Sequence, residues 1–174
     1  MAAPRFSEQL SVQIGNELSA HNQYLACAVY FDGLTMPQMA AFFYAQAEEE
    51  RQHALMMVQY LLDTDAPVEI PGVAAPTTAF ADVIAPVKLA LEQERAVTDQ
   101  INGLVRIARE EHDYAAEQFL QWFVKEQVEE VAKMSDLLAV VTRSADHVND
   151  IEQYVEREQG AEGTDPTAPR AAGA

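Results

Sequence analysis

The segment EEERQH, residues 48–53, combines carboxylates with an imidazole inside a region whose apolar residues recur at helical spacing. Glu50 and His53 are three residues apart, so on an α-helix they lie on one face, about one turn from each other. Carboxylate oxygen and imidazole nitrogen are good ligands for divalent metal ions. The spacing therefore predicts either a solvated helix face or part of a metal site that faces the core.

Three other long segments show an interruption of the same kind. Steps of four and three residues along each apolar stripe reach polar residues near the middle of the segment. The polar residues that we expect to meet are Glu17, Glu50, His53, Glu94, Gln127 and Glu130. The midpoints of packed helices share one layer whichever way each helix runs. Each residue adds only about 1.5 Å along the axis, so residues a few positions from a midpoint stay close to this layer. The pattern thus predicts one buried polar layer.

Four carboxylates in one buried layer cannot all be ionised without compensation, because burying a single unpaired charge already costs several kcal/mol. Two divalent cations would balance the four negative charges, which favours a dinuclear metal site. A ligand set rich in oxygen, with one imidazole and one amide, favours iron or manganese, although Zn²⁺ would compete. Taken alone, Glu94 fits a boundary residue whose carboxylate reaches solvent, and a single Glu-x-x-His is weak evidence for a metal.

The same periodicity predicts an all-α protein with four long helices and a short fifth. The expected ranges are Ser7–Phe31, Met36–Asp63, Val83–Glu110, Asp113–Arg143 and Asp146–Glu158. A short turn joins the first two helices and another joins the last two, so each pair is antiparallel. Between the second and third helices lie about 20 residues with three prolines, enough extended chain to cross a helix of about 42 Å. Two hairpins joined by one long crossover form the ferritin-like type of four-helix bundle.

Composition limits the other possibilities. The chain has 174 residues, 49% of them hydrophobic, and a formal charge of −17. We expect one domain over residues 1–159 and a disordered tail over residues 160–174, which are rich in Ala, Gly and Pro. The negative charge disfavours nucleic acid as a partner, and no segment resembles a signal peptide or a membrane span. The single cysteine, Cys27, excludes an internal disulfide and fits a cytoplasmic protein.

From Ser7 to about Glu158 the sequence resembles the bacterial non-haem ferritins. The segments NELSAHNQYLACAVYFD and QFLQWFVKEQVEEVAKM carry most of the resemblance, and VEIPGV in the crossover resembles actinobacterial members. The resemblance implies a di-iron ferroxidase centre in which Glu17, Glu50 and His53 hold one iron. Glu94 and Glu130 would complete the second iron, Glu50 would bridge the pair, and Gln127 would lie beside them. Tyr24 matches the aromatic residue that this family has beside the centre, although it also fits ordinary core packing.

Bacterial ferritins often have a third iron position, which here matches Glu49, Glu126 and Glu129. The alternative for these three residues is a solvated acidic helix face. The acidic residues at the end of the third helix and the start of the fourth, Glu110, Glu111, Asp113 and Glu117, could line access channels at three-fold axes. Haem is not expected, because bacterioferritins have a second Glu-x-x-His on the fourth helix, where this chain has Gln127-x-x-Glu130.

The resemblance implies a shell of 24 identical subunits that oxidises Fe²⁺ with dioxygen or hydrogen peroxide and stores a ferric oxyhydroxide mineral. Two alternatives stay open. A twelve-subunit, DNA-protecting mini-ferritin would hold its iron between subunits, and the chain has no basic arm for DNA. A di-iron or di-manganese oxidase acting on an organic substrate would need an apolar pocket beside the metals.

Overall fold

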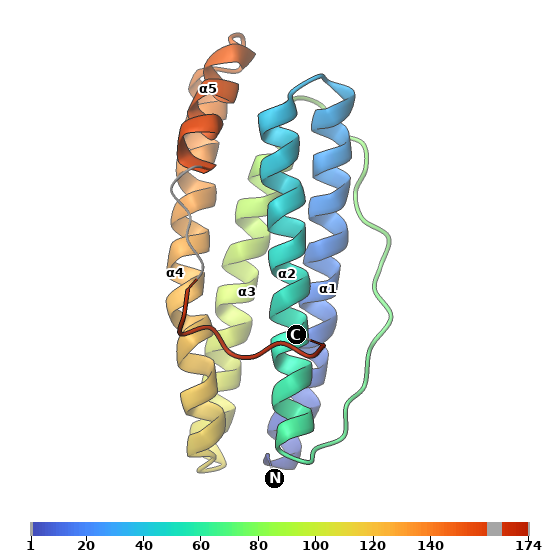
Figure 1. The fold of residues 1–174 in the computed structure, drawn as a ribbon, viewed down its shortest axis with the longest axis vertical. Helices are drawn as coiled ribbons and strands as arrows, with labels where there is room; N and C mark the ends of the chain where they lie inside the picture. The colour runs from blue at the N-terminus through green and yellow to red at the C-terminus, as the bar shows by residue number, and fades with distance from the viewer. Residues whose placement is uncertain (1, 160–164, 174) are drawn as a thin grey trace.

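The computed structural model describes residues 2–159 and 165–173, and this part of the chain contains five helices (Figure 1). Their limits are α1 Pro4–Gly33, α2 Pro37–Asp63, α3 Ile84–Glu110, α4 Tyr114–Arg143 and α5 Val148–Gln159. The long helices α1–α4 form an antiparallel bundle, and α5 lies at one end of it. The predicted all-α fold, a ferritin-like four-helix bundle with a long crossover and a short fifth helix, is confirmed. The predicted helix limits differ from the observed ones by at most about three residues.

The helices α1, α2 and α3 end in the same hydrogen-bonded turn. A non-glycine residue with positive φ, namely Thr35, Asp65 or His112, follows each helix. After α1, the Met36 N–H donates to the Phe31 carbonyl at 3.1 Å, which satisfies a carbonyl that the helix itself leaves unpaired. The turns after α1 and α3 lead directly into α2 and α4. The antiparallel pairs α1–α2 and α3–α4 therefore follow from local turn structure.

The crossover between α2 and α3, residues 64–83, runs along α1 on the outside of the bundle (Figure 1). The Gln23 side chain fixes it by a pair of hydrogen bonds with the Thr77 backbone, because its Nε2 donates to the carbonyl at 2.9 Å and its Oε1 accepts from the N–H at 2.8 Å. Pro71 packs directly against the helix at Gly15. These contacts hold an extended segment in place without regular secondary structure.

The fifth helix is fixed to the start of α2. Its Glu152 carboxylate accepts hydrogen bonds from the backbone N–H groups of Gln38 and Met39, at 2.9 and 3.0 Å. These are N–H groups that the first turn of α2 cannot satisfy itself, and a negative charge is favourable at this helix end. Ile151 and Val155 are buried on the same side of α5. The short helix is thus joined to the bundle by one charged cap and a small apolar contact.

The sequence predicts a disordered tail over residues 160–174, and this limit of the domain stays a prediction. Residues 160–164 lie outside the described residues, but residues 165–173 cross α4 and α2 without forming a helix or strand (Figure 1). Asp165 accepts hydrogen bonds from the Trp122 indole at 3.2 Å and from Lys125 at 3.0 Å, and the Ala172 N–H donates to the Leu55 carbonyl at 3.0 Å. Composition does not reveal these specific contacts, which is why it predicts disorder for the whole segment.

The hydrophobic core consists of two separate clusters. One lies at the α5 end and includes Phe31, Phe43 and Met134; the other lies at the opposite end and includes Phe6 and Leu120. The central turns of the four long helices lie between the clusters. In the described part of the chain, no helix is long and apolar enough to cross a membrane.

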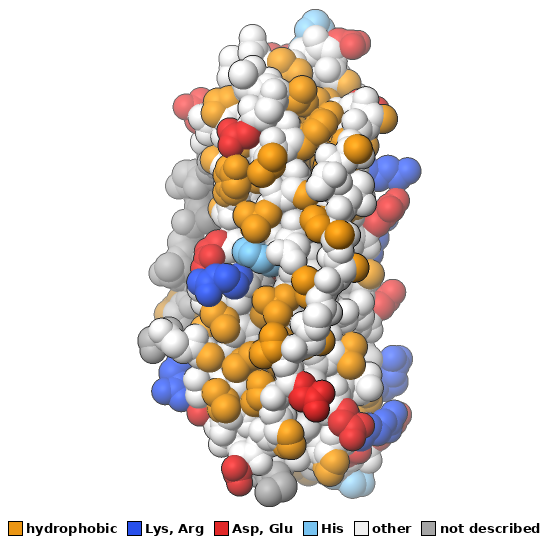
Figure 2. Space-filling model, turned by 90° about the vertical axis from the view of Figure 1, so that its right-hand side faces the viewer, with side chains coloured by type: hydrophobic (Ala, Val, Ile, Leu, Met, Phe, Trp, Pro, Cys, Tyr) orange, Lys and Arg blue, Asp and Glu red, His pale blue; other side chains and the backbone are white. Residues whose placement is uncertain are grey.

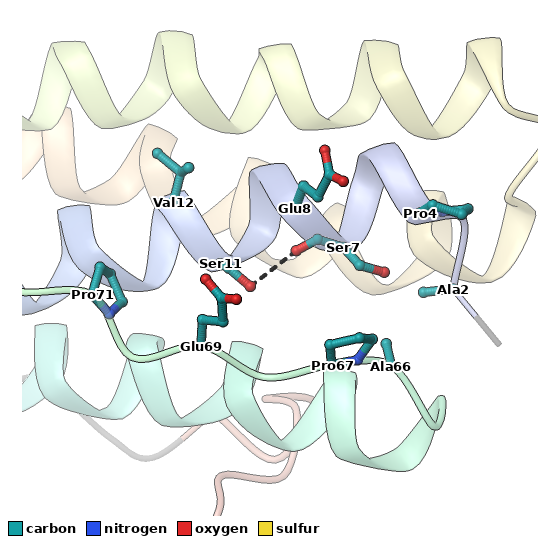
Figure 3. Close-up of a pocket in the computed structure, with 10 residues that line it drawn as sticks. All are labelled: Ala2, Pro4, Ser7, Glu8, Ser11, Val12, Ala66, Pro67, Glu69 and Pro71. Carbon is teal, nitrogen blue, oxygen red and sulfur yellow. Dashed lines mark hydrogen bonds between the residues drawn. The ribbon is translucent and has the colours of Figure 1, made fainter.

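The outer face formed by α1 and the crossover is rich in exposed apolar side chains (Figure 2). Val12, Val29 and Ile70 expose 54%, 62% and 62% of their surface. Beneath the first part of the crossover lies a pocket of about 410 Å³, lined mainly by prolines, alanines and Val12, with Glu8 and Glu69 on opposite walls (Figure 3). None of its lining residues belongs to the predicted polar layer, so it is not the candidate site.

The contact between Gly15 and Pro71 gives a prediction about stability. An alanine in the middle of a helix is favoured over glycine by about 1 kcal/mol. A Cβ at residue 15 would, however, lie 2.6 Å from Pro71 Cγ. We expect Gly15→Ala to lower the thermal unfolding midpoint by a few degrees, because the crossover must move. In a Pro71→Ala background, which removes that atom, the same change should raise the midpoint. A rise of equal size in both backgrounds would show that the crossover does not constrain α1.

Candidate metal centre

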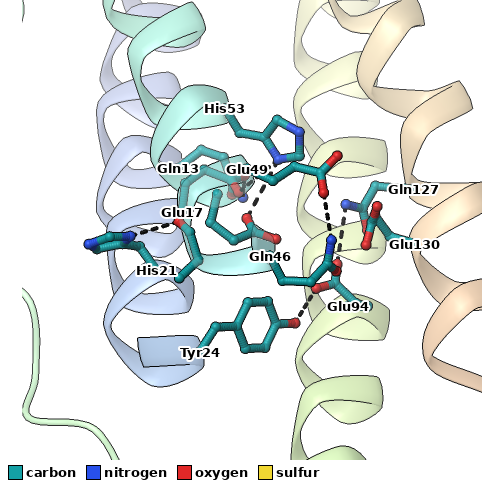
Figure 4. Close-up of polar contacts among 12 residues, drawn as sticks. Gln13, Glu17, His21, Tyr24, Gln46, Glu49, His53, Glu94, Gln127 and Glu130 are labelled. Atoms are coloured by element: carbon teal, nitrogen blue, oxygen red, sulfur yellow. Dashed lines mark hydrogen bonds and ion pairs between the residues drawn. The ribbon is translucent and has the colours of Figure 1, made fainter. Parts of the chain in front are cut away.

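The four long helices bring all six residues predicted for the polar layer into the middle of the bundle. Figure 4 labels Glu17, His53, Glu94, Gln127 and Glu130. They are Glu17 on α1, Glu50 and His53 on α2, Glu94 on α3, and Gln127 and Glu130 on α4. Each exposes between 1% and 4% of its surface. This burial removes the boundary-residue interpretation for Glu94, which is 1% exposed.

Three of these residues place their ligand atoms close together. His53 Nδ1 lies 3.5 Å from Glu50 Oε2 and 3.9 Å from Glu17 Oε2. Both separations are too long for good hydrogen bonds, whose usual length is about 2.9 Å. Two ligand atoms that each lie about 2.1 Å from one ion can be up to about 4.2 Å apart, so both distances suit donors that share a cation. Glu17, Glu50 and His53 form a group whose ligand atoms all lie within 4.8 Å of one another.

The carboxylate on α3 is held by two donors. The Tyr24 hydroxyl donates to Glu94 Oε1, and Gln127 Nε2 lies 3.4 Å from Glu94 Oε2. Gln127 is itself oriented by Thr98, whose hydroxyl donates to the amide oxygen at 3.0 Å. Tyr24, which is fully buried, therefore has a polar contact within the layer in addition to its packing against Phe43.

The carboxylate on α4 has a cationic partner. Lys133 Nζ lies 2.7 Å from Glu130 Oε1 and 3.8 Å from Glu49 Oε2. Within the described residues, Glu94 and Glu130 do not join any group of three close metal-binding side chains. The structure therefore brings together the ligands expected for one metal position. The carboxylates expected for the second position are held by Tyr24, Gln127 and Lys133.

Burial raises the pKa of every carboxylate in the layer. For Glu17, burial is the largest cause of the raised pKa, and the charge of Glu50 raises this pKa further. The pKa of Glu50 is raised by burial and then by the charge of Glu94, and hydrogen bonds from Tyr24 and Gln127 only partly oppose the rise for Glu94. Burial raises the pKa of Glu130 to about 8, although the Lys133 ammonium opposes the rise. Part of the charge in this layer is thus removed by protonation near neutral pH.

Several buried polar atoms in the layer have no hydrogen-bond partner. They include one oxygen each of Glu17, Glu50 and Glu130, and His53 Nε2. Buried polar atoms without partners are rare, because each costs about 1–3 kcal/mol. A set of unpartnered carboxylate oxygens around an imidazole fits the binding of hard or intermediate divalent cations.

Neighbouring side chains fix the orientation of the α1 and α2 ligands. Gln13 donates to Glu17 Oε1 at 2.8 Å, and the His53 ring meets the rings of Trp122 and Phe123 edge-on, with centroids 5.6 and 5.8 Å away. His21, one helical turn beyond Glu17, instead has its Nδ1 2.7 Å from the Ala47 carbonyl, so it joins α1 to α2 (Figure 4).

The three residues expected at a third iron position do not form one group. Glu49 and Glu126 group with His53, each with a ligand atom within 4.8 Å of the others. Glu126 is 9% exposed. Glu129 lies outside this group and forms an ion pair with Lys125 at 3.5 Å, with 58% of its side chain exposed. The structure thus favours Glu49 and Glu126 over Glu129 as cation ligands.

An open pocket of about 810 Å³ leads from the surface to this group, between α2 and α4. Five carboxylates line it, namely Glu48, Glu49, Glu126, Glu129 and Asp165, and so do the cations Lys125 and Lys133. Asp165 and Ala168 of the C-terminal segment form part of its rim. The carboxylates outnumber the lysines, so the pocket is acidic, although Met56 and Trp122 also line it.

The sequence does not predict some residues that contact the site. Lys133 is the clearest case, although its position three residues after Glu130 is a spacing that can be recognised as an i,i+3 pair. The suggested channel acids all have partners within the chain. Asp113 accepts from Ala3 and Ala116, Glu111 accepts from Phe6, Glu110 pairs with Arg5, and Glu117 pairs with Arg109.

Comparison with known proteins gives a consistent result. Residues 7–144 match the family described as the ferritin-like domain. The chain is 52% identical to ferritin BfrB of Mycolicibacterium smegmatis over 97% of its length and 93% of the relative's, and 37% identical to a bacterial non-heme ferritin of Staphylococcus aureus over 92% and 96%. An open-pore ferritin from Archaeoglobus fulgidus superimposes with a TM-score of 0.87 at 28% identity, covering 94% of this chain and 100% of that one.

The raised carboxylate pKa values predict how the metal-free protein responds to pH. Glu130 has a pKa of about 8 in the fold and an ordinary value of 4.5. Between these values the folded state binds more protons than the unfolded chain, so the free energy of unfolding falls as pH rises. We expect the melting temperature of the metal-free protein to drop by roughly 5 °C or more from about pH 5 to pH 8. Glu130→Gln cannot ionise and should show a shallower drop; equal slopes would contradict the pKa assignment.

Proposed function

Because the chain belongs to the ferritin family, we propose that it stores iron and oxidises Fe²⁺ at a di-iron ferroxidase centre inside each subunit. The observation that carries the proposal is the group formed by Glu17, Glu50 and His53, buried at the centre of the bundle with unpartnered ligand atoms. The curated relatives are called ferritins, which supports iron as the metal.

Fe²⁺ is the substrate of the proposed reaction. Glu17, Glu50 and His53 bind one ion; Glu94 and Glu130 bind the second, and Glu50 lies between the two. Two Fe²⁺ ions lose one electron each. Dioxygen accepts the two electrons with two protons to give hydrogen peroxide, or hydrogen peroxide accepts them with two protons to give two water molecules. The Fe³⁺ ions then leave for a ferric oxyhydroxide mineral. Gln127 does not add charge to the centre, and its amide instead orients Glu94.

The protein contributes charge balance and fixed geometry. Two Fe²⁺ ions carry four positive charges, which compensate the four carboxylates whose pKa values burial raises. Binding of the ions releases the protons that the raised pKa values favour, because carboxylates ligate metals in their ionised form. Glu94 stays oriented through Tyr24, and the aromatic rings around His53 hold the imidazole in place.

The alternatives find less support. An oxidase for an organic substrate needs an apolar pocket at the metals, whereas the pocket that reaches His53 combines Met56 and Trp122 with five carboxylates and two lysines. A DNA-protecting mini-ferritin holds iron between subunits, whereas one chain here supplies the complete candidate set. The formal charge of −17 also disfavours DNA.

We further propose that 24 subunits form a hollow shell in the cytoplasm, as the family resemblance implies. The exposed apolar side chains of α1 and the crossover, including Val12, Val29 and Ile70, supply a surface that contact between subunits would cover (Figure 2). Light scattering coupled to gel filtration should give a particle of about 460 kDa, from a subunit of 19.2 kDa. A mass near half of this value would favour the twelve-subunit alternative.

The central position of Glu50 predicts the order of mutational effects. After the protein is loaded with Fe²⁺ without oxygen, Glu50→Ala should oxidise the iron roughly tenfold more slowly than wild type, or slower still. The effect should exceed that of Glu17→Ala or Glu94→Ala, because the Glu50 carboxylate binds both ions. Stopped-flow absorbance after mixing with oxygenated buffer measures the rate. Glu92→Ala is the control, because Glu92 pairs with Lys88 at the surface of α3 and lines none of the pockets described above. If Glu50→Ala and Glu92→Ala both oxidised iron at the wild-type rate, the centre would be wrongly assigned.

A further inference from the structure

Lys133 occupies the inner end of the acidic pocket, where the pocket meets the carboxylate layer. Its side chain is 22% exposed and lines the pocket together with Glu49, Glu126 and His53. Its ammonium lies 2.7 Å from the buried Glu130 and 3.8 Å from Glu49, which are on different helices. Within the described residues, it is the only Lys or Arg in a salt bridge with a carboxylate of the layer.

The pocket side of the layer has its own features of a cation site. Glu49, His53 and Glu126 each offer a ligand atom within 4.8 Å of the others. His53 is 2% exposed, and its Nε2 has no hydrogen-bond partner, whereas its Nδ1 is the atom close to Glu17 and Glu50. One imidazole therefore lies between the pocket and the centre, and because a neutral imidazole has one nitrogen lone pair, it can bind a cation on one side at a time.

We propose that the Lys133 ammonium is an exchangeable counter-ion that gates the passage of cations between the pocket and the centre. In this role it neutralises Glu130 and Glu49 when no divalent cation is near. A cation that binds Glu49, Glu126 and His53 displaces the ammonium from Glu49, and one that moves on to Glu130 displaces it completely. The inference rests on the proposed function only in that the cation is Fe²⁺ and the destination is the ferroxidase centre.

Electrostatics makes the exchange feasible. The ammonium and a divalent cation are attracted to the same carboxylates and repel each other at short range, so the two compete. The Lys133 side chain reaches the pocket and is partly exposed, so it can move its charge into solvent without burying it unpaired. Lys133 is therefore a positioning residue, which acts on iron through the availability of Glu49 and Glu130.

A structural salt bridge is the simpler account, and a matched lysine separates the two. Lys125 lines the same pocket from the same helix, but its partners are Glu129 and Asp165, which do not belong to the layer. Lys133→Met and Lys125→Met remove the same charge from the same pocket and leave a side chain of similar length. A difference between them reflects contacts that Lys133 makes and Lys125 does not, among them those with Glu130 and Glu49.

The experiment measures Zn²⁺ binding to the assembled metal-free protein by calorimetry, because Zn²⁺ binds oxygen and nitrogen ligands without redox chemistry. We expect Lys133→Met to strengthen the weaker, pocket-side binding step about tenfold, and Lys125→Met to change it less than about threefold. The rise in melting temperature at saturating Zn²⁺ should also be larger for Lys133→Met than for wild type. Lys133→Arg keeps the charge and should bind the pocket-side ion no more tightly than wild type.

Two outcomes would overturn the gate. Equal Zn²⁺ affinities for Lys133→Met and Lys125→Met would assign Lys133 a structural role, and so would a gain in affinity for Lys133→Arg as large as that for Lys133→Met. Particle mass and helix content show whether the variants are folded. Failure of the proposed function is a separate result: wild type would then lack the tight Zn²⁺ ions that Glu50→Ala removes. If these tight ions are present and only the weaker step is insensitive to Lys133, the gate alone fails.

Discussion

One constraint governs this molecule: four carboxylates must be kept at the centre of a helical bundle, where each costs free energy unless it is compensated. The hydrophobic core accordingly does not run through the whole bundle. It is divided into two clusters, one toward each end, and the polar layer lies between them. Each cluster holds the helices together independently of the layer. The side chains of the layer can therefore be metal ligands, because the apolar packing on both sides of the layer stabilises the fold.

The layer is compensated in three ways that differ from helix to helix. Glu17 receives a hydrogen bond from a glutamine on its own helix, Glu94 receives one from a buried tyrosine, and Glu130 meets an ammonium. Protonation accounts for part of the remaining charge, as the raised pKa values indicate. None of these compensations uses every ligand atom, and the unpartnered oxygens of Glu17 and Glu50 face the same imidazole nitrogen, His53 Nδ1. The least compensated part of the layer is thus also the part best arranged to bind a cation.

The sequence was sufficient to predict the bundle and the residues of the layer, for a physical reason. Helical periodicity reports which face of each helix is buried, and a helix midpoint locates a residue along the axis to within a few ångströms. Periodicity carries no information about side chains that reach across from another turn. The pairing of Lys133 with both Glu49 and Glu130, the diversion of Glu129 to Lys125, and the docking of Asp165 on Trp122 all depend on rotamers and loop paths. The family resemblance placed Glu126 and Glu129 in the same set, and their spacing of three residues puts them on one helix face. The structure separates them, since Glu126 turns toward His53 and Glu129 toward solvent.

The side of the bundle between α2 and α4 shows why the different surroundings of Glu126 and Glu129 matter for iron. The pairs α1–α2 and α3–α4 are joined by tight turns, and the crossover covers α1, so the groove between α2 and α4 is the side through which the pocket reaches the layer. A cation entering this groove first meets exposed carboxylates whose lysine partners are also exposed, and such pairs are weak and easily exchanged. Deeper in the groove it meets carboxylates that are progressively more buried, where each ligand gains strength as water is excluded. Cation affinity should therefore rise along the path from Glu129 through Glu126 to Glu50. Carboxylates that outnumber the lysines and become more buried along the path direct cations inward. The Lys133 ammonium at the last step compensates the buried Glu130 in the metal-free protein.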